Sequence, residues 1–185
     1  NAVAVDLAKV SLWLVTLARD HAFTFLDHAL RHGDSLVGLS RKQIEAFHWD
    51  PDAPRFQAGF EIMRVGEKVT EVSELRQLIR ESDEIISDWE LRDLWEKAQS
   101  ELSYVRLFGD LVVAAFFEEE KSKEREVKRG EYASAVSSGD TDQYRGQLEE
   151  WRHLSPPLVP FHWEIEFPEV FERDNPGFDA ILGNP

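Results

Sequence analysis

Three things are scarce in this sequence: cysteine, basic residues and long apolar runs. The chain has no cysteine, so it can form neither a disulfide framework nor a thiolate metal site, and a cytoplasmic location is the expectation. Its 21 Lys and Arg stand against 36 Asp and Glu, and the resulting net charge of −15 would repel a phosphate backbone. We therefore expect that this stretch does not bind nucleic acid by itself.

The apolar residues near the start of the chain form a run that is too short to cross a membrane. The run covers Val10 to Ala18 and has charged neighbours on both sides, whereas a membrane span needs about 20 apolar residues. Good helix formers with helical spacing predict a helix over residues 2–20 instead. Because its apolar residues lie on nearly all sides, we expect this helix to be buried between a sheet and another layer. The spacing is carried by Val3, Leu7, Val10, Leu14 and Leu17.

Residues 39–155 are rich in charge and have the periodicity of long helices. Two apolar stripes with helical spacing run from Ile62 to Ile79 and from Leu91 to Phe116. Helices of this kind must bury their stripes against each other, so the pattern predicts an antiparallel helical hairpin. Gly109 interrupts the second stripe, which predicts a close helix contact or a kink at that point.

The rest of this charged region has weaker patterns. The mixed-charge run Glu118–Arg129 is typical of a solvated helix end or a mobile loop. Residues Tyr132–Asp142 favour a flexible link, and a short helix is predicted from about Asp142 to Trp151. A cluster of prolines within residues 155–160 indicates the end of the region.

Three short segments near the ends of the chain have strand-like patterns. Ala29–Arg31 is predicted to be a short strand that ends before Gly33. Aromatic and apolar residues alternate from Phe161 to Phe167, as in a half-buried strand. Ala180–Leu182 is an apolar run that ends in Gly-Asn-Pro and is typical of a buried parallel strand. The carboxyl edge of such a strand is where open α/β sheets place their chemistry.

Four phrases of the sequence belong together: F-D-A-I-L-G-N-P at residues 178–185, F-H-W-E-I-E-F-P-E-V-F at residues 161–171, G-D-S-L at residues 33–36, and the predicted helix in residues 1–14. They resemble the amino-group methyltransferases, in particular the DNA adenine-N6 methylases of the type IIG restriction–modification enzymes. The first phrase resembles motif IV of that family, the second the lead-in to it, the third motif III, and the fourth the helix that follows motif II. The phrases occur in the order that the family has.

The resemblance implies roles for four residues. The Asn184 side chain and the Pro185 carbonyl would accept the amine hydrogens of a flipped-out adenine and aim its lone pair at the methyl donor. Asp34, with Ser35 beside it, would contact the adenine of S-adenosylmethionine, which is the cofactor of the family. The family's glycine-rich loop and ribose-binding acid do not occur here. We therefore expect an inactive internal stretch of a longer enzyme, which neither binds the cofactor by itself nor supplies the parts that hold double-stranded DNA.

Together the patterns predict a mainly α chain, in which a long helical insertion is flanked by partial elements of a Rossmann-like α/β methyltransferase sheet. Residues 1–38 would be a core segment with the motif III strand, and residues 39–155 would be the insertion. Residues 156–185 would return to the core and end in the motif IV strand. The enzyme as a whole would methylate adenine N6 at a specific DNA site, in a restriction–modification or phage-defence system.

The residues themselves leave plainer interpretations open. Asp34 is also typical of a turn or a helix N-cap, and the pair Asn184 and Pro185 can simply end a strand in a turn. Glu166 and Glu169 are expected on a solvated strand face.

Neither of two possible metal patterns is specific, and two other functions remain open. His28 and His32 are four residues apart but lack a third ligand. The Glu-x-Lys pairs at 119–121 and 126–128, with Asp110 upstream, lie on a predicted helix rather than on the adjoining strands of a nuclease site. We therefore expect no metal site. The other functions are methyl transfer to a protein glutamine or an RNA guanine amine, and a protein-interaction role for the acidic insertion.

Overall fold

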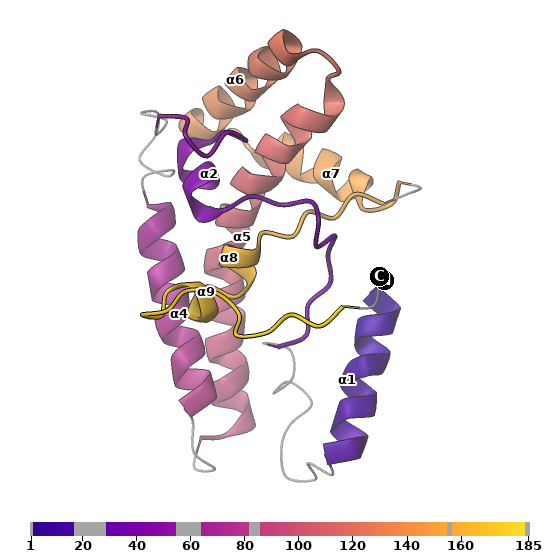
Figure 1. The fold of residues 1–185 in the computed structure, drawn as a ribbon, viewed down its shortest axis with the longest axis vertical. Helices are drawn as coiled ribbons and strands as arrows, with labels where there is room; N and C mark the ends of the chain where they lie inside the picture. Colours follow the sequence, from indigo (N-terminus) through magenta and orange to yellow (C-terminus); the bar gives the residue numbers. More distant parts are fainter. Residues whose placement is uncertain (1, 17–28, 55–63, 82–85, 155–156, 184–185) are drawn as a thin grey trace.

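The computed structural model describes residues 2–16, 29–54, 64–81, 86–154 and 157–183 of the 185-residue chain. These residues are mainly α-helical, as predicted, and Figure 1 shows their arrangement. The helices are α1 (Ala2–Thr16), α2 (Arg41–Ala46), α4 (Val65–Glu81), α5 (Asp88–Glu118), α6 (Ser122–Ser138), α7 (Asp142–Trp151), α8 (Trp163–Glu166) and α9 (Pro168–Phe171).

The three predicted strands are wrong, and the expected sheet elements do not form in the described ranges. Ala29–Arg31 and residues 180–182 follow irregular paths. The segment with alternating aromatics instead forms α8 and α9, because the N–H groups of Ile165 and Glu166 both donate to the His162 carbonyl and start a helical turn. A short apolar run becomes a strand only where another strand satisfies its backbone groups, and the described part of the chain supplies none.

Helices α4 and α5 form the predicted antiparallel hairpin, side by side in Figure 1. Helix α5 begins at a capping box, in which Ser87 and Glu90 satisfy N–H groups of the first turn. The apolar stripes of the two helices share one core, and each fully buried Val or Leu side chain contributes about 1.5–3 kcal/mol. This core includes Val65, Val69, Val72 and Leu75 from α4, and Ala98, Leu102, Val105 and Leu111 from α5.

The segment after α5 forms a helix from Ser122 to Ser138, where a solvated helix end or mobile loop and then a flexible link were predicted. Helix α6 packs against α5, and the hydroxyl of its buried Tyr132 donates to the Glu118 carboxylate at 2.5 Å. Gly139 ends the helix in the left-handed region, with φ of 77°. Helix α6 has a narrow apolar stripe that includes Tyr132 and Val136. Burial of this stripe explains why the helix forms. The predicted helix α7 is confirmed at Asp142–Trp151.

Helix α1 confirms the predicted helix as far as Thr16, but its expected burial is wrong. Val3, Leu7 and Leu14 are 64%, 62% and 58% exposed, because no sheet covers this helix in the described part of the structure. None of the helices in the described ranges has the length and apolar character that a membrane span requires.

Candidate functional site

Two segments that are far apart in the sequence lie in contact, residues 33–39 and residues 159–163, with helices α2 to α7 between them in the sequence. We call this contact the junction. The Asp34 N–H donates to the Val159 carbonyl at 2.7 Å, and the Phe161 N–H donates to the Val37 carbonyl, also at 2.7 Å. The two segments run parallel at this bridge. The junction therefore ties residues that precede α2 to residues that follow α7.

Two glycines allow this close approach. A Cβ atom on Gly33 would lie 2.5 Å from the Phe161 ring, and one on Gly38 would lie 2.0 Å from the Phe161 carbonyl oxygen. In the same contact, the Trp163 indole donates its Nε1–H to the Ser35 carbonyl at 3.0 Å. Any larger side chain at Gly38 would collide with backbone, so this position requires glycine.

His162 links the junction to α5. Its ring is buried, and its Nδ1 accepts the Leu39 N–H at 3.0 Å. Because Nδ1 accepts, the neutral ring carries its proton on Nε2, which lies 3.2 Å from the Asp110 Oδ1 atom and donates to it. The ring fits because α5 has Gly109 there, where a Cβ atom would lie 2.4 Å from Nε2. The predicted close contact at Gly109 is therefore with a histidine ring rather than with another helix.

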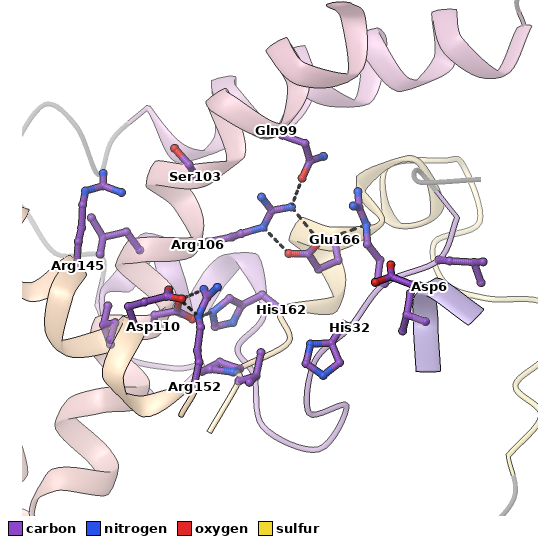
Figure 2. Close-up of a pocket in the computed structure, with 18 of the residues that line it drawn as sticks. Asp6, His32, Gln99, Ser103, Arg106, Asp110, Arg145, Arg152, His162 and Glu166 are labelled. Carbon is purple, nitrogen blue, oxygen red and sulfur yellow. Dashed lines mark hydrogen bonds and ion pairs between the residues drawn. The ribbon is translucent and has the colours of Figure 1, made fainter. Parts of the chain in front are cut away.

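A cleft of about 510 Å³ opens beside the junction, between α1, α5, α7 and the segment that leads into α8. Figure 2 shows Arg106 between Gln99 and Glu166 in its wall. The Arg106 guanidinium donates from Nε and Nη2 to the two carboxylate oxygens of Glu166, at 2.5 and 2.9 Å. Its Nη2 also donates to the Gln99 Oε1 atom at 3.0 Å. Arg31 approaches the same carboxylate, with its Nε 3.5 Å from Oε2.

A third arginine, Arg76 from α4, completes this cluster of charges. Arg76 is 3% exposed and donates to the Glu166 carbonyl at 2.5 Å and to the Glu169 carboxylate at 2.8 Å. The Arg31 guanidinium lies over the Trp95 ring, 4.3 Å from its centroid. The expectation that Glu166 and Glu169 lie on a solvated strand face is wrong. Glu166 ends α8 and Glu169 lies in α9, with Phe167 in a non-helical conformation between them, and each carboxylate contacts an arginine, Glu166 with Arg106 and Glu169 with Arg76.

The balance between burial and ion pairing explains the titration of the cluster. Burial by itself raises the pKa of the Glu166 carboxyl, but the Arg106 hydrogen bonds and the charges of Arg106 and Arg31 outweigh burial and hold the pKa below its ordinary value. Burial lowers the pKa of the Arg31 guanidinium to about 10, because the attraction of Glu166 offsets only part of the loss of hydration. Glu166 is therefore the charged centre on which the arginines converge.

Of the four residues with predicted roles, the structure describes Asp34 and Ser35. Asp34 and Ser35 are exposed, and the Asp34 Oδ1 atom accepts the Leu36 N–H at 3.1 Å, which is the turn geometry of the plainer interpretation. A pocket of about 210 Å³ adjoins Ser35. Asn184 and Pro185 lie outside the described residues.

The described residues contain no cluster of three His, Cys, Asp or Glu side chains that could hold a metal ion. His28 lies outside these residues, and His32 is exposed on the cleft. The Asp110 carboxylate pairs with the His162 ring and does not form a site with the Glu-x-Lys residues. In the second Glu-x-Lys pair, the Glu126 carboxylate contacts the His48 ring at 3.0 Å.

Sequence reasoning missed the buried Arg76 and the partly buried Arg106, although the pattern contains a signal for both. Arg76 lies four residues after Val72 and three before Ile79, on the apolar stripe of α4. Arg106 follows Leu102 by four residues in α5. A charged residue at a stripe position indicates a buried partner elsewhere in the chain, because an unpaired buried charge is too costly.

Comparison with models of protein families, with curated proteins and with solved structures finds no match to this chain. What defines the molecule is therefore its mainly α fold, its junction and its buried charge cluster.

Proposed function

We propose that this chain is part of an S-adenosylmethionine-dependent DNA adenine-N6 methyltransferase. The observation that carries the proposal is the junction. In it, the G-D-S-L phrase of residues 33–36 contacts the F-H-W phrase that begins at Phe161. Each phrase resembles the family separately, and a sequence motif gains weight when its structural context fits. Two unrelated chance resemblances would have no reason to meet across the insertion.

The junction also supports the interpretation of residues 39–155 as an insertion, a division of the chain that stays a prediction. The chain leaves the junction after Leu39 and returns to it at Val159, so its entry and exit lie close together. Insertions are tolerated where the two ends of the inserted segment meet at the surface of an existing fold. A methyltransferase core can therefore carry the helices between motif III and motif IV without losing its own connections.

The turn at Asp34 has features that suit a contact with the cofactor. The junction holds its backbone, while the side chains of Asp34 and Ser35 stay exposed. In the proposed enzyme the Asp34 carboxylate accepts a hydrogen bond from the adenine amine of S-adenosylmethionine. The adjoining pocket of about 210 Å³ is smaller than the roughly 300–1,000 Å³ of complete small-molecule sites. The described residues thus fit one edge of the cofactor, which supplies an electrophilic methyl group when it is bound.

The proposed role of Asn184 and Pro185 follows from the chemistry of the target amine. The N6 amine of adenine is a weak nucleophile because its lone pair is delocalised into the ring. Two acceptors that take its two N–H groups hold the nitrogen in place and return electron density to it. The Asn184 side-chain oxygen and the Pro185 carbonyl are the two acceptors in this proposal.

The proposal is tested in a protein that contains this chain together with the glycine-rich loop and the motif IV aromatic of the family. Asn184→Ala should lower kcat for adenine methylation about 100-fold or more, with little change in cofactor affinity. Asp34→Ala should weaken cofactor binding about tenfold, because it removes one hydrogen bond to a charged acceptor. Asp142→Ala, which removes a 99% exposed carboxylate on α7, is the matched control and should change neither.

Two outcomes would contradict the proposal. One is an Asn184→Ala protein with a lower thermal midpoint and unchanged specific activity, because Asn184 would then be a turn residue. The other is methyl transfer to a protein glutamine or to RNA under conditions where DNA adenine is not methylated. The second result would keep an amino-group methyltransferase but assign it a different substrate.

A further inference from the structure

The wall of the 510 Å³ cleft contains hydrogen-bond donors that have no acceptor among the described residues. They are Nη2 of Arg31 and Nε2 of Gln99, and both atoms are buried; the buried Nε of Arg31 has only the long contact of 3.5 Å to the Glu166 Oε2 atom. Gln99 cannot satisfy its nitrogen by turning its amide over, because its oxygen already accepts from Arg106. Buried donors are nearly always satisfied in folded proteins. An acceptor-rich ligand in the cleft would satisfy them.

The charge of the cleft differs in sign from that of the whole chain. Five cationic side chains line it against four acidic ones, although the chain carries a net charge of −15. All four acids are paired within the cleft, Glu166 with Arg106, Asp110 with His162, Asp6 with Lys9 and Glu149 with Arg152, which leaves an excess of one cation. The cations are Lys9, Arg31, Arg106, Arg145 and Arg152, and the acids are Asp6, Asp110, Glu149 and Glu166.

Two of these arginines lie at the accessible side of the cleft. Arg145 and Arg152, both on the α7 side of Figure 2, are 39% and 46% exposed. Both form only long ion pairs: Arg152 lies 3.6 Å from Glu149 and 3.9 Å from Asp110, and Arg145 lies 3.8 Å from Asp142. Guanidinium groups bind phosphate oxygens through paired N–H donors at about 2.7–2.9 Å, so a phosphate would make shorter contacts to these arginines than the carboxylates do.

We propose that this cleft binds a phosphate-bearing small molecule, with a nucleotide as the ligand that fits it best. Its volume of about 510 Å³ is in the range of small-molecule sites, which is roughly 300–1,000 Å³. The charged wall would hold the phosphate. Apolar side chains, including Leu30, Leu107, Leu148 and Val159, would contact a base or sugar. The residues that line this site do not include Asp34 or Ser35, so the inference does not depend on the proposed methyltransferase function.

The test measures binding of pyrophosphate, 2′-deoxyadenosine monophosphate and deoxyadenosine to the full 185-residue chain by titration calorimetry at constant ionic strength. We expect one site for each phosphate compound, a rise in the thermal midpoint on binding, and no binding of deoxyadenosine. Binding of pyrophosphate without the nucleotide would still support a phosphate site and would assign it to the free anion. Absence of binding by both phosphate compounds at millimolar concentration would overturn the proposal, as would equal affinity for deoxyadenosine and its monophosphate.

Variants then locate the site. Arg152→Gln should weaken binding at least tenfold, and because the side chain is half exposed the protein should keep its fold. Gln99→Met should also weaken binding, because it removes a buried donor. Arg92→Gln makes the same change of charge at an exposed residue of α5 outside the cleft. It should leave the dissociation constant unchanged. Equal weakening by Arg152→Gln and Arg92→Gln would show non-specific attraction and would overturn the proposal.

Discussion

Replacement of Glu166 by Gln tests whether the charge cluster holds the segments that contain Arg31 and Glu166 to the helical hairpin. The substitution keeps the shape of the side chain but removes the negative charge on which Arg106 and Arg31 converge. The Glu166 side chain is only 11% exposed, so solvent does little to compensate the arginines that remain. A buried cation without its partner is the costly product of this change.

The expected magnitude follows from the contacts. Arg106 makes two hydrogen bonds to the carboxylate, and each charge-assisted bond contributes about 1.5–3 kcal/mol. Loss of one partner from a buried ion pair costs about 3–5 kcal/mol. We therefore expect Glu166→Gln to lower the free energy of unfolding by about 3–5 kcal/mol, a large share of the roughly 5–15 kcal/mol that a domain has.

Urea denaturation followed by tryptophan fluorescence measures this loss as a lower midpoint at constant slope. The matched control is Glu96→Gln in α5, because the Glu96 carboxylate pairs with Arg92 at 3.2 Å while both side chains are mostly exposed. Such pairs contribute about 0.2–1 kcal/mol. Adding Arg31→Met to Glu166→Gln should recover part of the loss, since it removes an uncompensated cation. A loss below about 1 kcal/mol for Glu166→Gln would refute the reasoning.

Three further changes test the packing and the titration. Leu102→Ala removes a fully buried side chain of α5 and should cost about 2–5 kcal/mol in urea denaturation; a thermally silent variant would contradict the hairpin core. Gly109→Ala forces a Cβ atom to within 2.4 Å of the His162 ring and should cost about 1–3 kcal/mol, whereas Gly130→Ala in α6, with nothing within 4 Å, should stabilise by up to about 1 kcal/mol. Equal midpoints for these two variants would count against the placement of the ring. Because the Glu166 pKa is lowered in the folded state, its stabilisation is present above the unfolded-state pKa of about 4.3 and is lost as pH falls through the folded-state value. The Glu166→Gln variant should therefore show a smaller loss of stability in acid than the wild-type protein, and identical acid profiles would contradict the ion pair.

The long helices could be predicted from the sequence because their signal is local. The stripes that begin at Val65 and Leu91 repeat at helical spacing through α4 and α5, and a sequence that buries one face of a helix must repeat in this way. Helix α6 was missed because only Tyr132 and a few small residues carry its buried face. A loop and a weakly amphipathic helix have nearly the same composition in such a segment.

The strand predictions show the limit of a pattern that spans few residues. From Phe161 to Phe167 the apolar residues alternate, but the chain folds into helical turns and its aromatic rings pack on one another. Phe161 and Trp163 meet edge to face at 4.8 Å between ring centroids. Phe178 reaches the same cluster, 5.6 Å from the Phe167 ring. Alternation over seven residues therefore did not distinguish a strand from two short helices.

The sequence by itself determined the helical character of the chain and its acidic charge, because both depend on residue types and on spacing within a few turns. Only the tertiary structure decided which polar groups are buried together. Arg106 and Glu166 are 60 residues apart, and Leu39 and His162 are 123 apart. Pairings over such distances leave no periodicity in a single sequence. They form because a buried charge or ring nitrogen must find a partner once the hairpin and the junction have removed it from water.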